Sequence, residues 1–129
     1  MQYVSDNEPA RFRWLDLAAV DARWAADFYA GMFGWHTGRQ RANGGEFFHF
    51  SAGGENIASL YQLGAQQIAG GVPSHWTPYI GVTDLDAAGT KAAALGGRVV
   101  VRPFSVDGMA RVSLVTDSVG ALIGLWELP

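Results

Sequence analysis

Apolar and polar residues alternate along two stretches of the chain, which is the pattern of a strand with one buried face. The first stretch is FRWLDLAAV, residues 12–20, in which Trp14 and Asp16 oppose a row of leucine and alanine. The second is SHWTPYIGV, residues 74–82, with the same alternation. The pattern predicts two strands that each bury one face and present more polar side chains on the other.

Each of these strands runs into an aspartate, Asp21 or Asp84, whose carboxylate can cap the first amides of a helix. After Asp21, apolar residues recur with helical spacing, and they predict a helix that ends at Gly34. The side chains that we expect to face the core are Trp24, Phe28 and Met32, with Ala25 and Tyr29 widening the stripe. For the second helix, which stops at Gly96, they are Leu85, Ala88, Ala92 and Leu95.

Three further strands follow each helix, separated by the turn sequences ANGG, AGGEN, VDGM and DSVG. We place them near residues 35–39, 46–51 and 56–63, and near residues 98–104, 110–116 and 121–128. The two halves therefore share one order, strand, helix and three strands, and the last strands repeat a heptad, IASLYQL and LIGLWEL. The sequence predicts one domain over residues 1–129, with module one at about 10–63, a Gly-rich linker at about 64–73 and module two at about 74–129.

Composition narrows the function classes. The chain has 129 residues, a net charge of -3, 49% hydrophobic and 16% charged residues, and no cysteine. The charge and the absence of a basic cluster argue against a nucleic-acid partner, and thiol catalysis and thiolate metal sites are excluded. No apolar run is long enough for a membrane span, so we expect a cytoplasmic protein. The low charge also favours a surface hidden in a partner subunit.

The segment DARWAADFYAGMFGW resembles the D-x-x-x-A-x-x-F-Y-x-x-x-F-G-W signature of the vicinal oxygen chelate superfamily, which includes glyoxalase I, extradiol dioxygenases and the bleomycin and fosfomycin resistance proteins. YIGVTDLDAAGTKAAALGGRVV and DSVGALIGLWEL resemble its second module and closing strand, and the W-x-D-L start resembles a glyoxalase-like subgroup. The resemblance implies an α+β fold of two βαβββ modules whose curled mixed sheets enclose a concave cavity. It also implies a homodimer, in which module one of one subunit pairs with module two of the other.

In metal-using members, the resemblance implies four His, Gln or Glu ligands on the first and last strands of the modules. Those positions fall on Trp14, Ser59, Thr77 and Gly124 here. An indole, two hydroxyls and a glycine do not form a divalent-metal site. We therefore expect no cofactor, although a divalent metal on other donors stays open, and we expect Ser59 and Gly124 to be small because a ligand occupies the space beside them.

Three residues are candidates for acid–base catalysis: Asp16, His49 and Tyr79. A simpler interpretation of Asp16 is that Arg13, Arg111 or a backbone amide holds it and that it only fixes its strand. The residues that we expect to line a ligand cavity are aromatic, small or hydroxyl-bearing. They are Trp14, Asp16, Ser59, Tyr61, Thr77, Tyr79, Phe104, Gly124 and Trp126.

Three functions remain open. The leading one is a protein that binds a small organic molecule in a metal-free, aromatic-lined cavity, as the bleomycin-type members do. The second is a glyoxalase-like enzyme with lyase, isomerase or dioxygenase-type chemistry on a small metabolite. The third is a non-catalytic interaction module. A fold alone does not choose among them.

Overall fold

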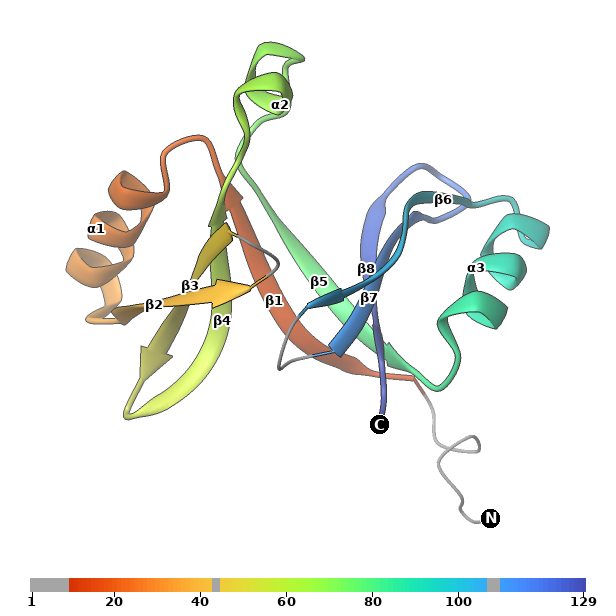
Figure 1. Cartoon of the computed structure of the whole chain (residues 1–129), viewed down its shortest axis with the longest axis horizontal. Helices are drawn as coiled ribbons and strands as arrows, with labels where there is room; N and C mark the ends of the chain where they lie inside the picture. Colours follow the sequence, from red (N-terminus) through yellow and green to blue (C-terminus); the bar gives the residue numbers. More distant parts are fainter. Residues whose placement is uncertain (1–9, 43–44, 107–109) are drawn as a thin grey trace. The chain divides into compact units, whose positions relative to one another are not determined.

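A computed structural model describes residues 10–42, 45–106 and 110–129 of the chain (Figure 1). The chain forms two compact units, one of residues 14–77 and the other of residues 78–129 with the segment up to Arg13. The second unit takes in the start of the first strand, where the Gly81 amide donates a hydrogen bond of 3.0 Å to the carbonyl of Arg11.

Both modules have the predicted order of elements. Module one consists of β1 (Phe12–Ala19), α1 (Ala22–Phe33), β2 (His36–Ala42), β3 (Gly45–Ala52) and β4 (Glu55–Gln62). Module two consists of β5 (His75–Val82), α3 (Leu85–Ala94), β6 (Arg98–Val106), β7 (Ala110–Thr116) and β8 (Leu122–Glu127). A short helix, α2 (Ala65–Ala69), lies in the stretch that the sequence predicts as a linker.

The strands of each module are paired in the same way. In module one the order is β2-β3-β4-β1, and in module two it is β6-β7-β8-β5. The first strand of a module runs parallel to its last strand, and the other pairs are antiparallel. One helix covers one face of each four-stranded part, α1 in module one and α3 in module two (Figure 1).

The repeated heptad has a structural role at the start of each helix. Gln62 accepts a hydrogen bond of 2.8 Å from the Ala22 amide through Oε1, and Glu127 accepts one of 2.9 Å from the Leu85 amide through Oε2. These amides open α1 and α3, and helical geometry leaves them without a partner inside the helix. The last strand of each module therefore holds the first turn of its own helix.

The predicted aspartate caps are confirmed. Oδ1 of Asp21 accepts from the Trp24 amide at 3.0 Å, and Oδ1 of Asp84 accepts from the Ala87 amide at 3.0 Å. Gly34 ends α1 in the left-handed conformation, with φ of 75°. The predicted turns ANGG and VDGM fall partly outside the described residues.

The prediction for the buried side of α1 is wrong for its three largest members. Trp24, Phe28 and Met32 are exposed, whereas Ala25 and Tyr29 of the predicted stripe pack against the core. The helix meets the sheet through Tyr29 and three alanines, Ala22, Ala25 and Ala26. Small side chains let a helix lie close to a sheet, so the large apolar residues of α1 are left on its outer side. The core beneath the helix is formed by Leu17, Ala19, Phe50, Ala58 and Leu60.

The core of module two is smaller, and one prediction for it is also wrong. Leu85, Val115 and Leu125 form the buried cluster, with Ala88 packed against it as predicted. Leu95 is exposed, because α3 ends at Ala94 and Leu95 is its C-terminal cap. Of the helices in the described part of the chain, none has the length and apolar character needed to cross a membrane.

Candidate functional site

Four residues of module one lie in one row across its sheet, perpendicular to the strands. Strand register pairs Gly38 of β2 with His49 of β3, His49 with Ser59 of β4, and Ser59 with Asp16 of β1. The neighbours of these residues, Leu17, Phe50 and Leu60, belong to the core under α1. Because side chains alternate along a strand, the row lies on the opposite face of the sheet.

A chain of hydrogen bonds ties three side chains of this face together. The indole N–H of Trp14 donates to Oγ of Ser59 at 2.8 Å, and the Ser59 hydroxyl donates to Oδ1 of Asp16 at 2.5 Å. Ser59 is buried, so its hydroxyl is committed to this chain. The interpretation in which Arg13, Arg111 or a backbone amide holds Asp16 is wrong, because Ser59 is its partner and Arg111 pairs with Glu127 at 3.1 Å.

The carboxyl group of Asp16 is in an unusual electrostatic state. Loss of solvent raises its pKa from 3.8 to about 6, while the Ser59 hydrogen bond and nearby His75 act in the opposite direction. Burial also raises the pKa of Tyr61, and the proximity of Asp16 raises it further, against a hydrogen bond with Gln67. Asp16 and Tyr61 are therefore close enough to influence each other. A carboxyl group that titrates near neutral pH can accept or release a proton under physiological conditions.

His49 completes the polar part of the face. It is only 8% exposed, and burial lowers its pKa, so the ring is neutral near pH 7. Its ring centroid lies 5.8 Å from that of Trp14 and 5.2 Å from that of Phe47, in edge-to-face arrangements. The site face thus combines one carboxyl, one neutral imidazole and one phenol with two further aromatic rings, and we call these residues the module-one site: Trp14, Asp16, Phe47, His49, Ser59 and Tyr61.

The equivalent row in module two carries neither a carboxyl nor an imidazole. Register pairs Tyr79 with Gly124 and Gly124 with Leu114, which stand where module one has Asp16, Ser59 and His49. A Cβ atom built on Gly124 would lie 2.4 Å from the Tyr79 ring. The expectation that Gly124 is small because a ligand occupies the space is therefore wrong, since the Tyr79 ring occupies it.

The predicted site residues divide between the two units. Trp14, Asp16, His49, Ser59 and Tyr61 come together in the unit of residues 14–77. That unit also contains Thr77, which is buried. The other unit contains Tyr79, Phe104, Gly124 and Trp126. Within it, the Tyr79 and Trp126 rings meet edge to face at 6.4 Å, and Phe104 is partly exposed on β6.

Two members of this environment escaped the sequence prediction. Phe47 could have been found, because it alternates with His49 on the same strand face. Gln67 forms a side-chain hydrogen bond with Tyr61 and lies in α2, within the predicted linker. The composition of that linker gave no sign of the contact.

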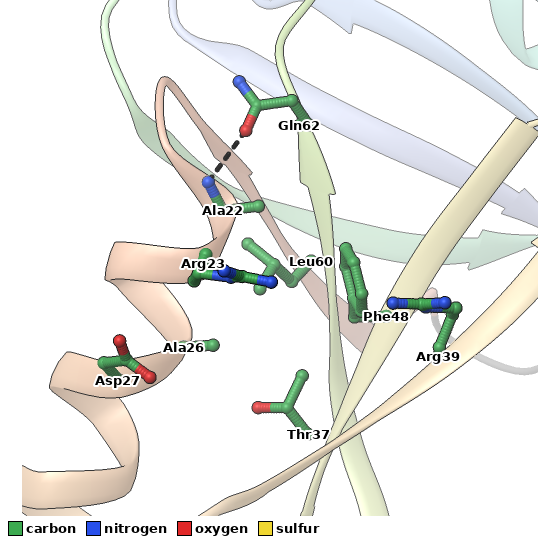
Figure 2. A pocket seen from close by; sticks show the side chains of 9 residues that line it. All are labelled: Ala22, Arg23, Ala26, Asp27, Thr37, Arg39, Phe48, Leu60 and Gln62. Carbon is green, nitrogen blue, oxygen red and sulfur yellow. Dashed lines mark hydrogen bonds between the residues drawn. The ribbon is translucent and has the colours of Figure 1, made fainter.

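A groove of about 400 Å³ lies on the other face of the same sheet, beside α1 (Figure 2). Its floor is apolar, and Arg23, Asp27 and Arg39 stand at its edge. Gln62 reaches into it but is committed to the Ala22 amide and to the carbonyls of Val20 and Leu63. The groove includes no residue of the predicted site, so it is a weaker candidate for the principal function.

A metal site can be judged only from the donors present. Among the side chains that the structure describes, no three His, Cys, Asp or Glu residues gather closely enough to hold one ion. The module-one site offers one carboxylate and one imidazole, and the Ser59 hydroxyl beside them already makes two hydrogen bonds. A typical divalent-metal site needs more oxygen or nitrogen donors than these.

Comparison with known proteins places these features in a family. The model of the Glyoxalase/Bleomycin resistance protein/Dioxygenase superfamily matches residues 11–125. The protein named "Putative glyoxylase CFP32" from Mycobacterium tuberculosis is 34% identical over 118 residues, which are 88% of this chain and 44% of that protein. "Anthracycline biosynthesis protein DnrV" from Streptomyces peucetius is 31% identical over 130 residues, with 92% and 47% covered. The chain thus spans less than half the length of these curated relatives.

Solved structures share the fold at low sequence identity. Hypothetical protein BH1468 from Bacillus halodurans superposes with a TM-score of 0.68 at 15% identity, covering 95% of this chain and 96% of that one. Methylmalonyl-CoA epimerase from Mycobacterium tuberculosis gives a TM-score of 0.62 at 17% identity, with 92% and 87% covered. Together with the family match over residues 11–125, the two βαβββ modules establish that the chain belongs to the glyoxalase/bleomycin resistance protein/dioxygenase superfamily.

Proposed function

We propose that the chain binds a flat, largely apolar organic molecule that carries a hydroxyl or N–H donor, and that the module-one site holds it. The observation that carries this proposal is the state of Asp16, a desolvated carboxyl with a pKa of about 6 that Ser59 links to the Trp14 indole. Burying a carboxylate costs free energy unless donors compensate it. A ligand donor would supply part of that compensation.

The hydrogen bonds of Asp16 leave room for such a donor. Ser59 donates to Oδ1, and within residues 10–42, 45–106 and 110–129 no donor reaches Oδ2. On the same sheet face, the His49 ring meets the Trp14 and Phe47 rings edge to face. Aromatic rings and one carboxylate acceptor on one face favour a planar molecule with a donor at its rim.

The name of one relative agrees with this chemical class. The Streptomyces peucetius relative is named for anthracycline biosynthesis, and anthracyclines are flat, polycyclic phenols. The chain spans only 47% of that protein. We therefore extend to this chain the class of molecule, flat aromatic compounds, and not the activity of the relative. Another structural neighbour is a methylmalonyl-CoA epimerase in complex with methylmalonyl-CoA, and that likeness supports the fold alone.

A matched pair of probes tests the proposal. 2-Naphthol and 2-methoxynaphthalene share one ring system, but only the first has a hydroxyl donor. Quenching of tryptophan emission should show 2-naphthol binding at least ~10-fold more tightly, because one hydrogen bond to a charged group contributes roughly 1.5–3 kcal/mol. Asp16→Asn should remove most of that difference, whereas Asp86→Asn on α3 should keep it. Equal affinity for both probes would contradict the donor requirement, and a soluble anthracycline extends the test to a larger ring system.

We also propose that this binding needs no divalent metal, since Trp14, Ser59, Thr77 and Gly124 stand at the family's metal positions. Addition of EDTA should leave both the melting temperature and the affinity for 2-naphthol unchanged. Elemental analysis that finds near one equivalent of zinc, nickel or iron in the purified chain would overturn this part of the proposal.

An acid–base enzyme is the second candidate, and the proximity of Asp16 to Tyr61 favours it. A carboxylate with a pKa of about 6 is poised to remove a proton from a carbon acid, and a phenol or a neutral imidazole can return one. For any ligand that the tryptophan-emission assay shows to bind, proton NMR in D₂O distinguishes the candidates. Exchange of a ligand C–H that stops in Asp16→Asn indicates an enzyme, and binding without exchange indicates a binding protein.

A further inference from the structure

The outer face of α1 carries large apolar side chains that the fold of the single chain leaves in solvent. Trp24 is 76% exposed, Phe28 59% and Met32 63%. At 100° per residue, Trp24, Phe28 and Gly31 lie within roughly 60° of one another around the helix axis. We call Trp24, Phe28, Gly31 and Met32 the α1 stripe. An exposed patch of this kind marks an interaction surface when the fold itself does not require it.

Module two shows that the fold does not require it. The repeat aligns Asp21 with Asp84, and both cap a helix that packs on its sheet. At the same offset of 63 residues, the counterparts of Trp24 and Phe28 are Ala87 and Lys91. The same helix therefore forms, caps and packs with a small and a charged residue on its outer side.

Gly31 is a second, independent sign of a close neighbour. Glycine is a poor helix residue compared with alanine, so its presence in a helix calls for a reason. A Cβ on Gly31 would meet nothing within 4 Å in this chain, and its counterpart in α3 is Ala94. The glycine of α3, Gly89, does have a reason within the chain, because a Cβ there would lie 3.1 Å from Val99.

The patch contains a hollow as well as protruding side chains. A groove of about 410 Å³, mostly apolar, runs beside the stripe, and Trp24 and Phe28 form part of its lining. A two-fold interface brings the same patch of two subunits together, so each patch must contain both a projection and a place to receive one. The exposed indole of Trp24 and the adjacent groove meet this condition.

We propose that the α1 stripe is a docking surface for the α1 stripe of a second copy of this chain, with the two helices antiparallel about a two-fold axis. Trp24 of each copy enters the groove of the other, and the helices approach closely at Gly31. α1 carries one positive and one negative residue, Arg23 and Asp27, so two copies of the helix have no net charge to hold them apart.

The size of the stripe sets the expected strength of the dimer. Burial of Trp24, Phe28 and Met32 in both copies removes on the order of 1,000 Å² from water. That area is at the lower end for a specific interface, which predicts a dissociation constant in the micromolar range. Sedimentation velocity from roughly 1 to 100 μM should therefore show a monomer that converts to a dimer.

Module two supplies the variants that test the surface. Trp24→Ala combined with Phe28→Lys installs the residues that α3 already tolerates, so the thermal melt of the monomer should be retained. We expect the dissociation constant of the dimer to rise at least ~100-fold above that of the wild type, because an aromatic anchor in an interface typically contributes several kcal/mol. Leu95→Lys removes an exposed apolar residue from the end of α3 instead, and this control should dimerise like the wild type.

Gly31→Leu separates close approach from simple loss of apolar area. The substitution adds apolar surface, yet it should weaken the dimer at least ~10-fold because it holds the two helices apart. A wild-type chain that stays monomeric over the whole concentration range overturns the proposal and leaves the stripe to a different partner. A dimer that both Gly31→Leu and the Trp24→Ala, Phe28→Lys variant leave intact overturns it equally, because the interface then lies elsewhere.

Discussion

The two modules place different chemistry at the same positions of one backbone. In module one, Asp16 and Ser59 form a hydrogen-bonded polar pair on the sheet face opposite α1. In module two, the corresponding pair is Tyr79 and Gly124, and an aromatic ring fills the space. The strand order and the caps are shared, so the fold itself does not demand a carboxyl at position 16. Module one carries the buried carboxyl of Asp16 although burial destabilises its charged form, and module two has no such group. We therefore attribute Asp16 to function and not to folding.

The sharpest way to break this comparison is to enlarge Gly124. Gly124→Leu places a side chain where the Tyr79 ring lies, so we expect a loss of about 3 kcal/mol or more in the free energy of unfolding by urea. Gly38→Val is the matched control in module one, because a Cβ there meets nothing within 4 Å. Its effect should stay below ~1 kcal/mol. If Gly124→Leu does destabilise the chain, adding Tyr79→Ala should restore most of the lost stability. A Gly124→Leu protein of unchanged stability would mean instead that the ring leaves this space readily.

The cost of the module-one carboxyl should appear in the pH dependence of stability. The pKa of Asp16 is about 6 in the folded chain and 3.8 as a reference, so the folded state holds the proton more tightly. Stability from this group is therefore greatest below pH 4 and declines as the pH rises to about 6. Asp16→Asn should remove that decline and raise the unfolding free energy at pH 7 by ~3 kcal/mol.

The control for this titration is Asp117→Asn, which alters a turn carboxylate that accepts from the amides of Val119 and Ala121. It should leave the decline between pH 4 and 6 in place. If the unfolding free energies of the wild type and Asp16→Asn change with pH in parallel, the Asp16 carboxyl is solvated. The two modules would then not differ in the electrostatic way described above.

Ser59 and Ser113 sharpen the comparison at the level of single hydroxyls. Ser59→Ala leaves the Trp14 indole and Asp16 without their shared partner, and we expect a loss of about 2 kcal/mol. It should also move the midpoint of the pH dependence upward, because the Ser59 hydrogen bond lowers the pKa of Asp16. Ser113→Ala removes a hydroxyl that donates to the Val101 carbonyl at 2.8 Å, so it should cost stability without moving the midpoint.

The smallest effect concerns the two residues that hold the helix starts. Gln62→Glu keeps an acceptor for the Ala22 amide but loses the donors to the carbonyls of Val20 and Leu63, so we expect a loss of about 1 kcal/mol at pH 7. Glu127→Gln keeps its acceptor for the Leu85 amide and gives up the pair with Arg111, a partly exposed ion pair worth at most about 1 kcal/mol. Urea unfolding of both variants measures the difference. A gain in Gln62→Glu together with a loss in Glu127→Gln would show that charge, and not donor geometry, governs both contacts, because a negative charge is favourable at a helix N-terminus.

Much of the architecture could be predicted because it depends on local signals. Alternation located β1 and β5, and the aspartates at positions 21 and 84 located the helix starts. The side of α1 that meets the sheet could not be predicted in the same way. The large apolar side chains are more hydrophobic than alanine, so the pattern favours the side that carries them. The sheet instead packs against the side with the alanines, which allows the helix to lie closer.

The candidate site shows the same division between local and distant information. Alternation along β1 correctly placed Trp14 with Asp16 on one face of the strand. The partner of Asp16 is Ser59, 43 residues away, and the register of β1 against β4 decides that contact. The prediction for Gly124 was wrong because a sequence does not show whether the space beside a glycine holds a ligand or a neighbouring side chain, here the Tyr79 ring.

The contacts of Gln62 and Glu127 also bear on hydrogen exchange. The Ala22 amide is bonded 40 residues further along the chain, and the Leu85 amide 42 residues further along. Amides in the first turn of a helix normally exchange by fraying, with little protection. These two can exchange only when the end of β4 or β8 separates from the helix. Their protection therefore reports whether a whole module has opened, and each module can be followed from a single amide at the start of its helix.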